Sequence, residues 1–183
     1  MENVVPIKLQ PLTAEAFSPY GSVLGLKSPA FPEVEGGRPV VLMSRIKRGT
    51  NNNRLEELAI HFSYNQTFIP VRGSMALVVA PPPHNQDAGP EGYQLDYDKI
   101  AAFVMEPGDA VIVDRGTWHT VVAIGDECLM ISGTRKGAEE GNTGEVESGR
   151  IPAAHNPVAQ KATPFIEFVN LKKRDNRIME LQL

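Results

Sequence analysis

Residues 57–80 read ELAIHFSYNQTFIPVRGSMALVVA and contain three short runs with the composition of β-strands. Residues 57–62, 66–70 and 74–80 are rich in β-branched, aromatic and other apolar side chains, which favour the pleated backbone of a sheet. An Arg-Gly pair at residues 72–73 separates the last two runs and predicts a tight reversal of the chain. This segment therefore predicts consecutive strands of one β-sheet.

Similar runs continue on both sides of this segment. They are found at residues 7–12, 23–26, 39–46, 110–113, 117–124 and 128–132. Residues 14–17, capped by Thr13, predict a short helix, and residues 96–104 predict a helix of one or two turns followed by a strand. Strands that recur at intervals of about 8 to 12 residues are typical of an all-β sandwich or barrel.

The composition limits the classes of function. The chain has 183 residues, 42% of them apolar and 22% charged, as expected of one globular domain with a tail. Eighteen basic and 22 acidic residues give a net charge of −4, so we expect no nucleic-acid partner. Residues 1–6 have no basic run or long apolar stretch, which predicts neither a signal peptide nor a membrane anchor. We expect a cytoplasmic protein that acts on small molecules.

The C-terminal part differs in character from residues 1–135. Residues 136–183 begin with a segment that is poor in large apolar side chains, for which no regular structure is predicted. Residues 164–171 regain the alternation of a strand, and residues 172–174, Lys-Lys-Arg, are expected to face solvent. We therefore divide the chain into a barrel domain, 1–135, and an irregular C-terminal extension, 136–183, with one strand packed on the same domain.

Few side chains are available for catalysis or metal binding. The one cysteine, Cys128, lies in an apolar run that predicts a buried thiol, and no cysteine cluster can form. Of the four histidines, His84 and His155 lie in segments that we expect to be loops facing solvent. His61 and His119 lie in predicted strands, which makes them the candidates for chemistry.

The spacing around His61 resembles the first sequence motif of the cupin superfamily, in which two histidines, a glutamate and a glycine follow one another at fixed intervals. Here Ala59 stands in place of the first histidine and His61 is the second. Gln66 replaces the glutamate, and Gly73 stands at the expected interval. The motif is therefore present in altered form.

The second cupin motif, Pro-x-Gly-x-x-His, resembles residues 114–119. Gly116 and His119 are kept, whereas Asp114 stands in place of the proline. The resemblance implies an all-β, cupin-like double-stranded β-helix, or jelly-roll barrel, with short helices and the C-terminal extension. It also implies that the two motifs meet at the barrel mouth.

The altered motifs change the expected chemistry. Three imidazoles and a carboxylate are the usual metal ligands of a cupin, and two imidazoles with a neutral amide hold a divalent ion less firmly. We therefore expect no cofactor, with a divalent metal at His61 and His119 as the alternative. We predict catalytic roles for His61, His119 and Gln66, because neutral imidazoles carry protons and an amide orients a polar substrate.

Five segments together resemble the ureidoglycolate lyase family, whose members act in allantoin breakdown within purine metabolism. They are residues 10–21, 44–45, 61–70, 77–80 and 115–119. Members of this family cleave ureidoglycolate to glyoxylate and urea, which implies a lyase that acts on a carbinolamide bearing a carboxylate. The departures include Thr120 and Asp114, at positions where members often carry histidine.

The resemblance also suggests how such a substrate is held. A carboxylate needs a cation, and the guanidinium of Arg45 or Arg115 can bind it through two parallel N–H bonds. Phe68 and Trp118 are assigned to substrate binding, and we expect them to be wall and core of the site rather than to take part in the chemistry. The order of proton transfer between the two histidines stays open.

Two other functions fit the same residues. The chain is a cupin-type protein that binds small acids or sugars, or an isomerase, if it has kept the scaffold and lost the lyase activity. It is a structural dimerisation module if aromatic side chains close the barrel mouth. Because cupin barrels commonly pair through their sheets, we also expect a homodimer.

Overall fold

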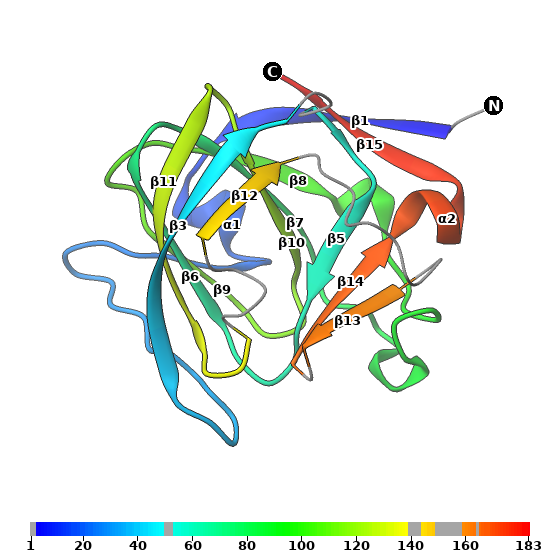
Figure 1. Ribbon diagram of the computed structural model, residues 1–183, viewed down its shortest axis with the longest axis horizontal. Coiled ribbons are helices and arrows are strands. Elements are labelled where there is room, and N and C mark those ends of the chain that lie inside the picture. Colours follow the sequence, from blue (N-terminus) through cyan, green and yellow to red (C-terminus); the bar gives the residue numbers. More distant parts are fainter. Residues whose placement is uncertain (1–2, 50–52, 139–143, 149–158, 164) are drawn as a thin grey trace.

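Two curled β-sheets make up most of the molecule (Figure 1). The computed structural model describes residues 3–49, 53–138, 144–148, 159–163 and 165–183. The helices of these residues are all short: α1 (Ala14–Phe17), α2 (Leu171–Asp175) and 3-10 turns at Gln86–Ala88 and Tyr97–Lys99. The prediction of an all-β, cupin-like jelly-roll barrel with short helices is confirmed.

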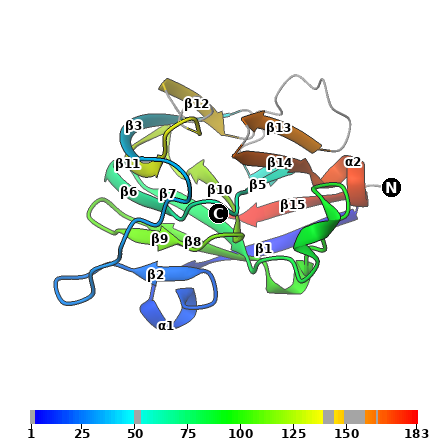
Figure 2. The same ribbon diagram turned by 90° about the horizontal axis from the view of Figure 1, so that it is seen from below.

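The larger sheet has nine strands. In order they are β13 (Ala159–Thr163), β14 (Ile166–Asn170), β5 (Glu57–Ile60), β10 (Trp118–Ala123), β7 (Met75–Ala80), β8 (Ala101–Met105), β1 (Asn3–Pro11), β15 (Arg177–Gln182) and β4 (Arg54–Leu55). β10 runs antiparallel to β7, whereas β1 runs parallel to both β8 and β15. The first and last strands of the chain thus lie side by side (Figures 1 and 2).

The smaller sheet has six strands. In order they are β12 (Gly144–Ser148), β3 (Pro39–Arg48), β11 (Glu127–Arg135), β6 (Gln66–Arg72), β9 (Val111–Val113) and β2 (Gly21–Val23). The long β3 and β11 pair antiparallel along their length, and β6 pairs with the other edge of β11. One face of this sheet covers the barrel interior.

The barrel core lies between the two sheets. Side chains from the smaller sheet, such as Ile46 and Phe68, pack there against Leu77 and Phe103 of the larger sheet. Every residue of β7 is buried, including those that face away from this core. A strand with both faces buried reads as a continuous apolar run, which explains the sequence MALVVA.

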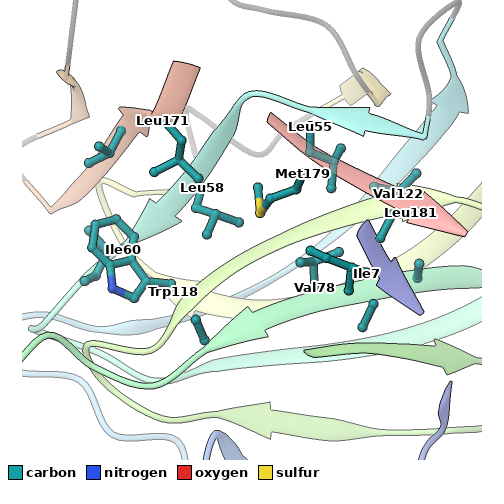
Figure 3. Close-up of a cluster of buried hydrophobic side chains, with 14 of the residues drawn as sticks. Ile7, Leu55, Leu58, Ile60, Val78, Trp118, Val122, Leu171, Met179 and Leu181 are labelled. Carbon is teal, nitrogen blue, oxygen red and sulfur yellow. The ribbon is translucent and has the colours of Figure 1, made fainter. Parts of the chain in front are cut away.

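A second hydrophobic core fills the other face of the larger sheet (Figure 3). Leu58 of β5, Val78 of β7 and Trp118 of β10 point into it from the middle strands. Met179 of β15 and Leu171 of α2 close it from the opposite side. The C-terminal segment is therefore part of a core.

The structure of residues 136–183 differs from the predicted irregular extension with a single strand at 164–171. β14 lies inside that range, but β12, β13 and β15 are also strands, and residues 171–175 form α2. The predicted solvated run at 172–174 is thus helical. β15 was missed because its pairing with β1 is a contact between the two ends of the chain, which local composition does not encode.

Other predicted elements match closely. Thr13 caps α1 as predicted, its side chain accepting a hydrogen bond from the Ala16 N–H at 3.2 Å. The strand predicted at 23–26 lies instead at Gly21–Val23, where β2 pairs with β9. No helix of the described residues is long and apolar enough to span a bilayer.

Candidate active site

His61 directly follows β5 and faces the barrel interior. Its Nδ1 lies 2.8 Å from the Tyr64 carbonyl oxygen, and its Nε2 lies 3.0 Å from Gln66 Oε1. The carbonyl of His61 accepts a hydrogen bond from the Gly116 N–H at 2.7 Å, which joins the two cupin motifs. Gly116 has φ +74°, and a Cβ there would lie 2.8 Å from the Phe62 ring, so the motif glycine is required.

His119 reaches the same point from β10. It pairs across the sheet with Ala59, and its Nδ1 lies 2.9 Å from the Thr117 carbonyl oxygen. Its Nε2 lies 3.2 Å from Gln66 Oε1, and the centres of the two imidazole rings are 4.8 Å apart. The prediction that His61, His119 and Gln66 lie together therefore agrees with the geometry. Their catalytic role stays a prediction.

The tautomers of the two histidines follow from their partners. A carbonyl oxygen accepts only, so the Nδ1 atoms of His61 and His119 carry the protons and the Nε2 atoms present lone pairs. We therefore orient the Gln66 amide so that its two N–H groups donate to the two Nε2 atoms. In this orientation the amide oxygen accepts a hydrogen bond from the Ser132 hydroxyl, 3.0 Å away. Every polar group of the cluster is then satisfied.

Burial keeps both histidines neutral. Loss of solvent, followed by the proximity of His119, lowers the pKa of His61 to about 3. Loss of solvent lowers the pKa of His119 to about 4. At neutral pH both rings can accept a proton at Nε2.

Aromatic side chains enclose the cluster. The Tyr64 ring is stacked on His61 with 3.7 Å between ring centres, and the Phe68 ring lies 5.8 Å from His119. Phe68 thus lies beside His119, and its predicted role in substrate binding stays a prediction. His61 and His119 are only 2% and 3% exposed, so a substrate must displace covering groups to reach them.

The structure does not bring the two predicted arginines to the cluster. Arg45 lies on the outer face of β3 and pairs with Glu127 at 3.7 Å, whereas its neighbours Ser44 and Ile46 are buried. Arg115 lies nearer, beside Gly116, but pairs with Glu33 at 3.2 Å and Glu35 at 3.5 Å. Both guanidinium groups already have carboxylate partners.

Trp118 does not lie at the cluster either. Successive strand residues face opposite sides of a sheet. Trp118 points into the second core (Figure 3), whereas His119 contacts Gln66 and Phe68 on the other side of the sheet. The Trp118 ring centre is 6.0 Å from that of Tyr93. The predicted position of Trp118 in the wall of the histidine site is therefore corrected: it is a core residue.

The comparisons with known proteins agree with this geometry. The profile of the family described as ureidoglycolate lyase matches residues 34–149, which include the whole histidine cluster. The chain belongs to the ureidoglycolate lyase family. The ureidoglycolate lyase of Chelativorans sp. (strain BNC1) is 31% identical over 152 residues, covering 73% of this chain and 86% of that protein. That of Burkholderia mallei (strain NCTC 10229) is 30% identical over 139 residues, covering 66% and 76%.

Two solved structures show a weaker similarity. A dTDP sugar isomerase from Desulfovibrio desulfuricans G20 has a TM-score of 0.40 and 15% identity, covering 63% of this chain and 68% of that chain. Oxalate decarboxylase from Bacillus subtilis has a TM-score of 0.35 and 16% identity, covering 69% and 27%. Neither similarity bears on the chemistry of this chain.

The departures from the ureidoglycolate lyase family lie outside the cluster. Thr120 pairs with Val78 and shares the face of β10 that carries Trp118, away from His119. Asp114 is exposed in the turn before β10. Partial loss of solvent around its carboxyl, followed by the charge of Glu33, raises the pKa of that carboxyl. Neither substitution removes a group from the histidine cluster.

The sequence analysis missed Ser132 and Thr134, which lie beside the cluster, and Glu57, which lies at the far end of β5 from His61. On β11, Ser132 and Thr134 are buried on the same face as Met130. Two polar residues on the inward face of an alternating strand were the sequence signal that could have identified them. Glu57 lies on the face of β5 opposite to Leu58, and burial raises the pKa of its carboxyl to about 7 against the opposing charge of Lys173. A lone glutamate at a strand end gives no such signal.

The donor set does not fit a firmly held divalent metal. His61 and His119 offer two nitrogens, and the third group is the neutral amide of Gln66. Among the described residues no group of three or more His, Cys, Asp or Glu side chains could hold a metal. His84 is exposed, as predicted, and His155 lies outside the described residues.

Proposed function

We propose that this chain is a ureidoglycolate lyase that forms glyoxylate and urea by proton transfer through two neutral histidines. The observation that carries the proposal is the convergence of His61 Nε2 and His119 Nε2 on the amide of Gln66, at 3.0 and 3.2 Å, in a member of this family. A substrate placed at this point meets two proton acceptors and a hydrogen-bonding amide.

Cleavage of ureidoglycolate moves one proton within the substrate. The carbinol hydroxyl loses its proton, and its C–O bond becomes the carbonyl of glyoxylate. The C–N bond breaks with its electron pair on nitrogen, and that nitrogen takes up a proton to leave as urea. A neutral imidazole that takes the first proton and returns it to nitrogen ends the cycle unchanged.

The lowered pKa values suit the second half of this cycle. An imidazolium with a pKa of about 3 or 4 is a strong acid, so His61 or His119 releases its proton readily to the poorly basic ureido nitrogen. Gln66 holds the Nε2 atoms in position and exchanges its amide hydrogen bonds for those of the substrate. The order in which the two rings act remains to be measured.

Catalysis by these groups needs no tightly bound cofactor. This part of the proposal is supported by the donor set of two imidazoles and an amide, which lacks an anionic ligand. Metal analysis of the purified protein, and assays before and after dialysis against a chelator, test it. Activity that disappears with the chelator and returns with one added metal ion would establish a metal at His61 and His119.

The purified protein should convert racemic ureidoglycolate to equal amounts of glyoxylate and urea. Glyoxylate is followed by its reduction with a coupled dehydrogenase, and urea is measured separately. A protein that is stabilised against heat by small acids or sugars but releases no glyoxylate would instead be a binding protein. Conversion of a sugar or acid into an isomer would identify an isomerase. The family relationship favours the lyase.

We propose that the partner of this chain is a second copy of itself. We also propose that the protein is cytoplasmic. The outer face of the smaller sheet carries Met43, Ile131 and Ile69 in one row across β3, β11 and β6, and Met43 is 55% exposed. Arg72 and Glu127, which form an ion pair with each other, lie toward one end of the same pair of strands. The single buried cysteine, Cys128, gives no sign of an oxidising compartment, and cell fractionation tests the location.

Replacing Met43 by arginine should convert the dimer into a monomer. In the proposed interface the new charge would be buried against an apolar surface with no counter-ion, which disfavours association. Light scattering coupled to size-exclusion chromatography measures the mass of the wild type and the variant. A wild-type protein that is monomeric at all concentrations, or a variant that stays dimeric, would contradict this interface.

A further inference from the structure

Arg135, at the end of β11, is a buried cation that has no carboxylate partner among the residues that the structure describes. It is 6% exposed, and no acidic side chain of the described residues pairs with it. Its Nε donates to the Glu35 carbonyl at 3.1 Å, Nη1 to that of Lys136 at 2.9 Å and Nη2 to that of Gly36 at 2.8 Å. Two of the five N–H groups of the guanidinium remain, one on each terminal nitrogen.

Close packing fixes this guanidinium in place. Its Cζ lies 3.4 Å from the centre of the Phe165 ring. A Cβ on Gly37 would lie 2.9 Å from Arg135 Cζ, so the backbone of residues 36–37 is pressed against the guanidinium. A buried charge held in this way is costly unless an anion compensates it.

Two buried hydroxyl groups lie beside Arg135. Tyr64 and Thr134 are 0% and 2% exposed, and apart from each other their hydroxyls have no hydrogen-bonding partner among the described groups. Burial raises the pKa of Tyr64, and a hydrogen bond with the Thr134 hydroxyl and the charge of Arg135 partly oppose this rise, so the three groups are close. A buried pair of hydroxyls with spare hydrogen-bonding capacity is satisfied by an ordered water or by a polar ligand.

These groups adjoin the histidine cluster. The Tyr64 ring is stacked on His61, and Thr134 follows Ser132, the partner of Gln66, on the inward face of β11. A ligand that meets the Tyr64 hydroxyl therefore lies within a few ångströms of the proposed proton carriers.

We propose that Arg135, Tyr64 and Thr134 form a buried binding site for the carboxylate of a small 2-hydroxy or 2-oxo acid. Its identification as the carboxylate of the substrate rests on the proposed lyase function. The remaining N–H groups of Arg135 and the two hydroxyl protons would supply the donors that a carboxylate accepts. Arg115 is the weaker candidate, since Glu33 and Glu35 already neutralise it.

The Tyr64→Phe variant tests this site without disturbing the fold. It keeps the ring on His61 and removes only a hydroxyl whose one described partner is the Thr134 hydroxyl, so we expect little change in the melting temperature. Binding of glyoxylate, measured by calorimetry, should weaken by about tenfold or more, as should the KM for ureidoglycolate. Thr134→Val should act in the same direction, and Arg135→Lys, which loses the planar fork, should weaken binding further.

Tyr97→Phe is the matched control. The Tyr97 hydroxyl donates to Asp175 at 2.6 Å, far along the chain from the cluster, so this variant should lose stability and keep its affinity for glyoxylate. Glycolaldehyde, which lacks the carboxylate, should bind wild type and Tyr64→Phe equally. If Tyr64→Phe and Thr134→Val both bind glyoxylate as tightly as wild type, the proposed site is wrong.

The same measurements separate this proposal from the lyase function. A wild-type protein that binds glyoxylate through Tyr64 but does not cleave ureidoglycolate would keep the carboxylate site and refute the lyase. A protein that cleaves ureidoglycolate with a KM unaffected by Tyr64→Phe and Thr134→Val would keep the lyase function and refute the carboxylate site.

Discussion

Replacing His119 by asparagine should lower kcat for ureidoglycolate cleavage by about 100- to 10,000-fold, and His61→Asn should have an effect of similar size. The amide N–H of asparagine can replace the Nδ1–H that His119 donates to the Thr117 carbonyl at 2.9 Å. The substitution therefore keeps the local bond and removes Nε2, the atom to which we assign proton transfer.

Steady-state kinetics with glyoxylate detection measures both variants, and circular dichroism confirms that they fold. If the two rings act as a unit, the double variant will be no slower than the slower single variant. His84→Asn is the matched control, because His84 is exposed and lies outside the cluster. Wild-type rates in both single variants would show that the proton moves by another route.

The sequence predicts the centre of the molecule well. The runs at 57–62, 66–70 and 74–80 are strands, because each combines β-forming side chains with a turn at its end. Motif spacing also predicts that His61 and His119 lie together, because the two cupin motifs fix the strand position of each histidine and the side of the sheet on which its side chain lies. Local pattern and long-range contact agree in this region.

The sequence fails where a residue's role depends on its environment. Arg45, Arg115 and Arg135 are equivalent as cations in the sequence, and only burial and pairing show that Arg135 has no carboxylate partner within the described part of the chain. Trp118 and His119 are neighbours in the motif, yet the alternation of the strand sends them into different cores. The second core itself depends on β15, whose pairing with β1 joins the ends of the chain.

The two neutral histidines should make the protein sensitive to acid. The pKa of His61 is lowered to about 3 and that of His119 to about 4, so between these values and about 6.5 the unfolded chain binds more protons than the folded one. Stability is then fully present above pH about 6.5 and is lost as the pH falls. At pH 4.5 the two rings together cost about 5 kcal/mol, a large part of a typical folding free energy.

Glu57 acts in the opposite sense. Its pKa is raised to about 7, so the folded state binds more protons than the unfolded state between about pH 4.5 and 7. This carboxyl therefore destabilises the fold as the pH rises through that range, by about 2 to 3 kcal/mol. The wild type should lose about 2 to 3 kcal/mol between pH 7 and 4.5, as the difference of the two effects.

Urea unfolding at pH 7 and pH 4.5 measures these contributions in wild type and variants. Glu57→Gln removes the opposing effect, so it should be more stable than wild type at pH 7 and lose about 5 kcal/mol between the two pH values. His119→Asn should lose about 2 kcal/mol less than wild type over the same interval. Glu56→Gln, which removes the partner of Lys172 at 3.0 Å, controls for the loss of a carboxylate at this strand end. Equal pH dependence in wild type, His61→Asn and His119→Asn would mean that the imidazoles are solvated in the folded protein, and the neutral proton carriers of the proposed mechanism would have to be abandoned.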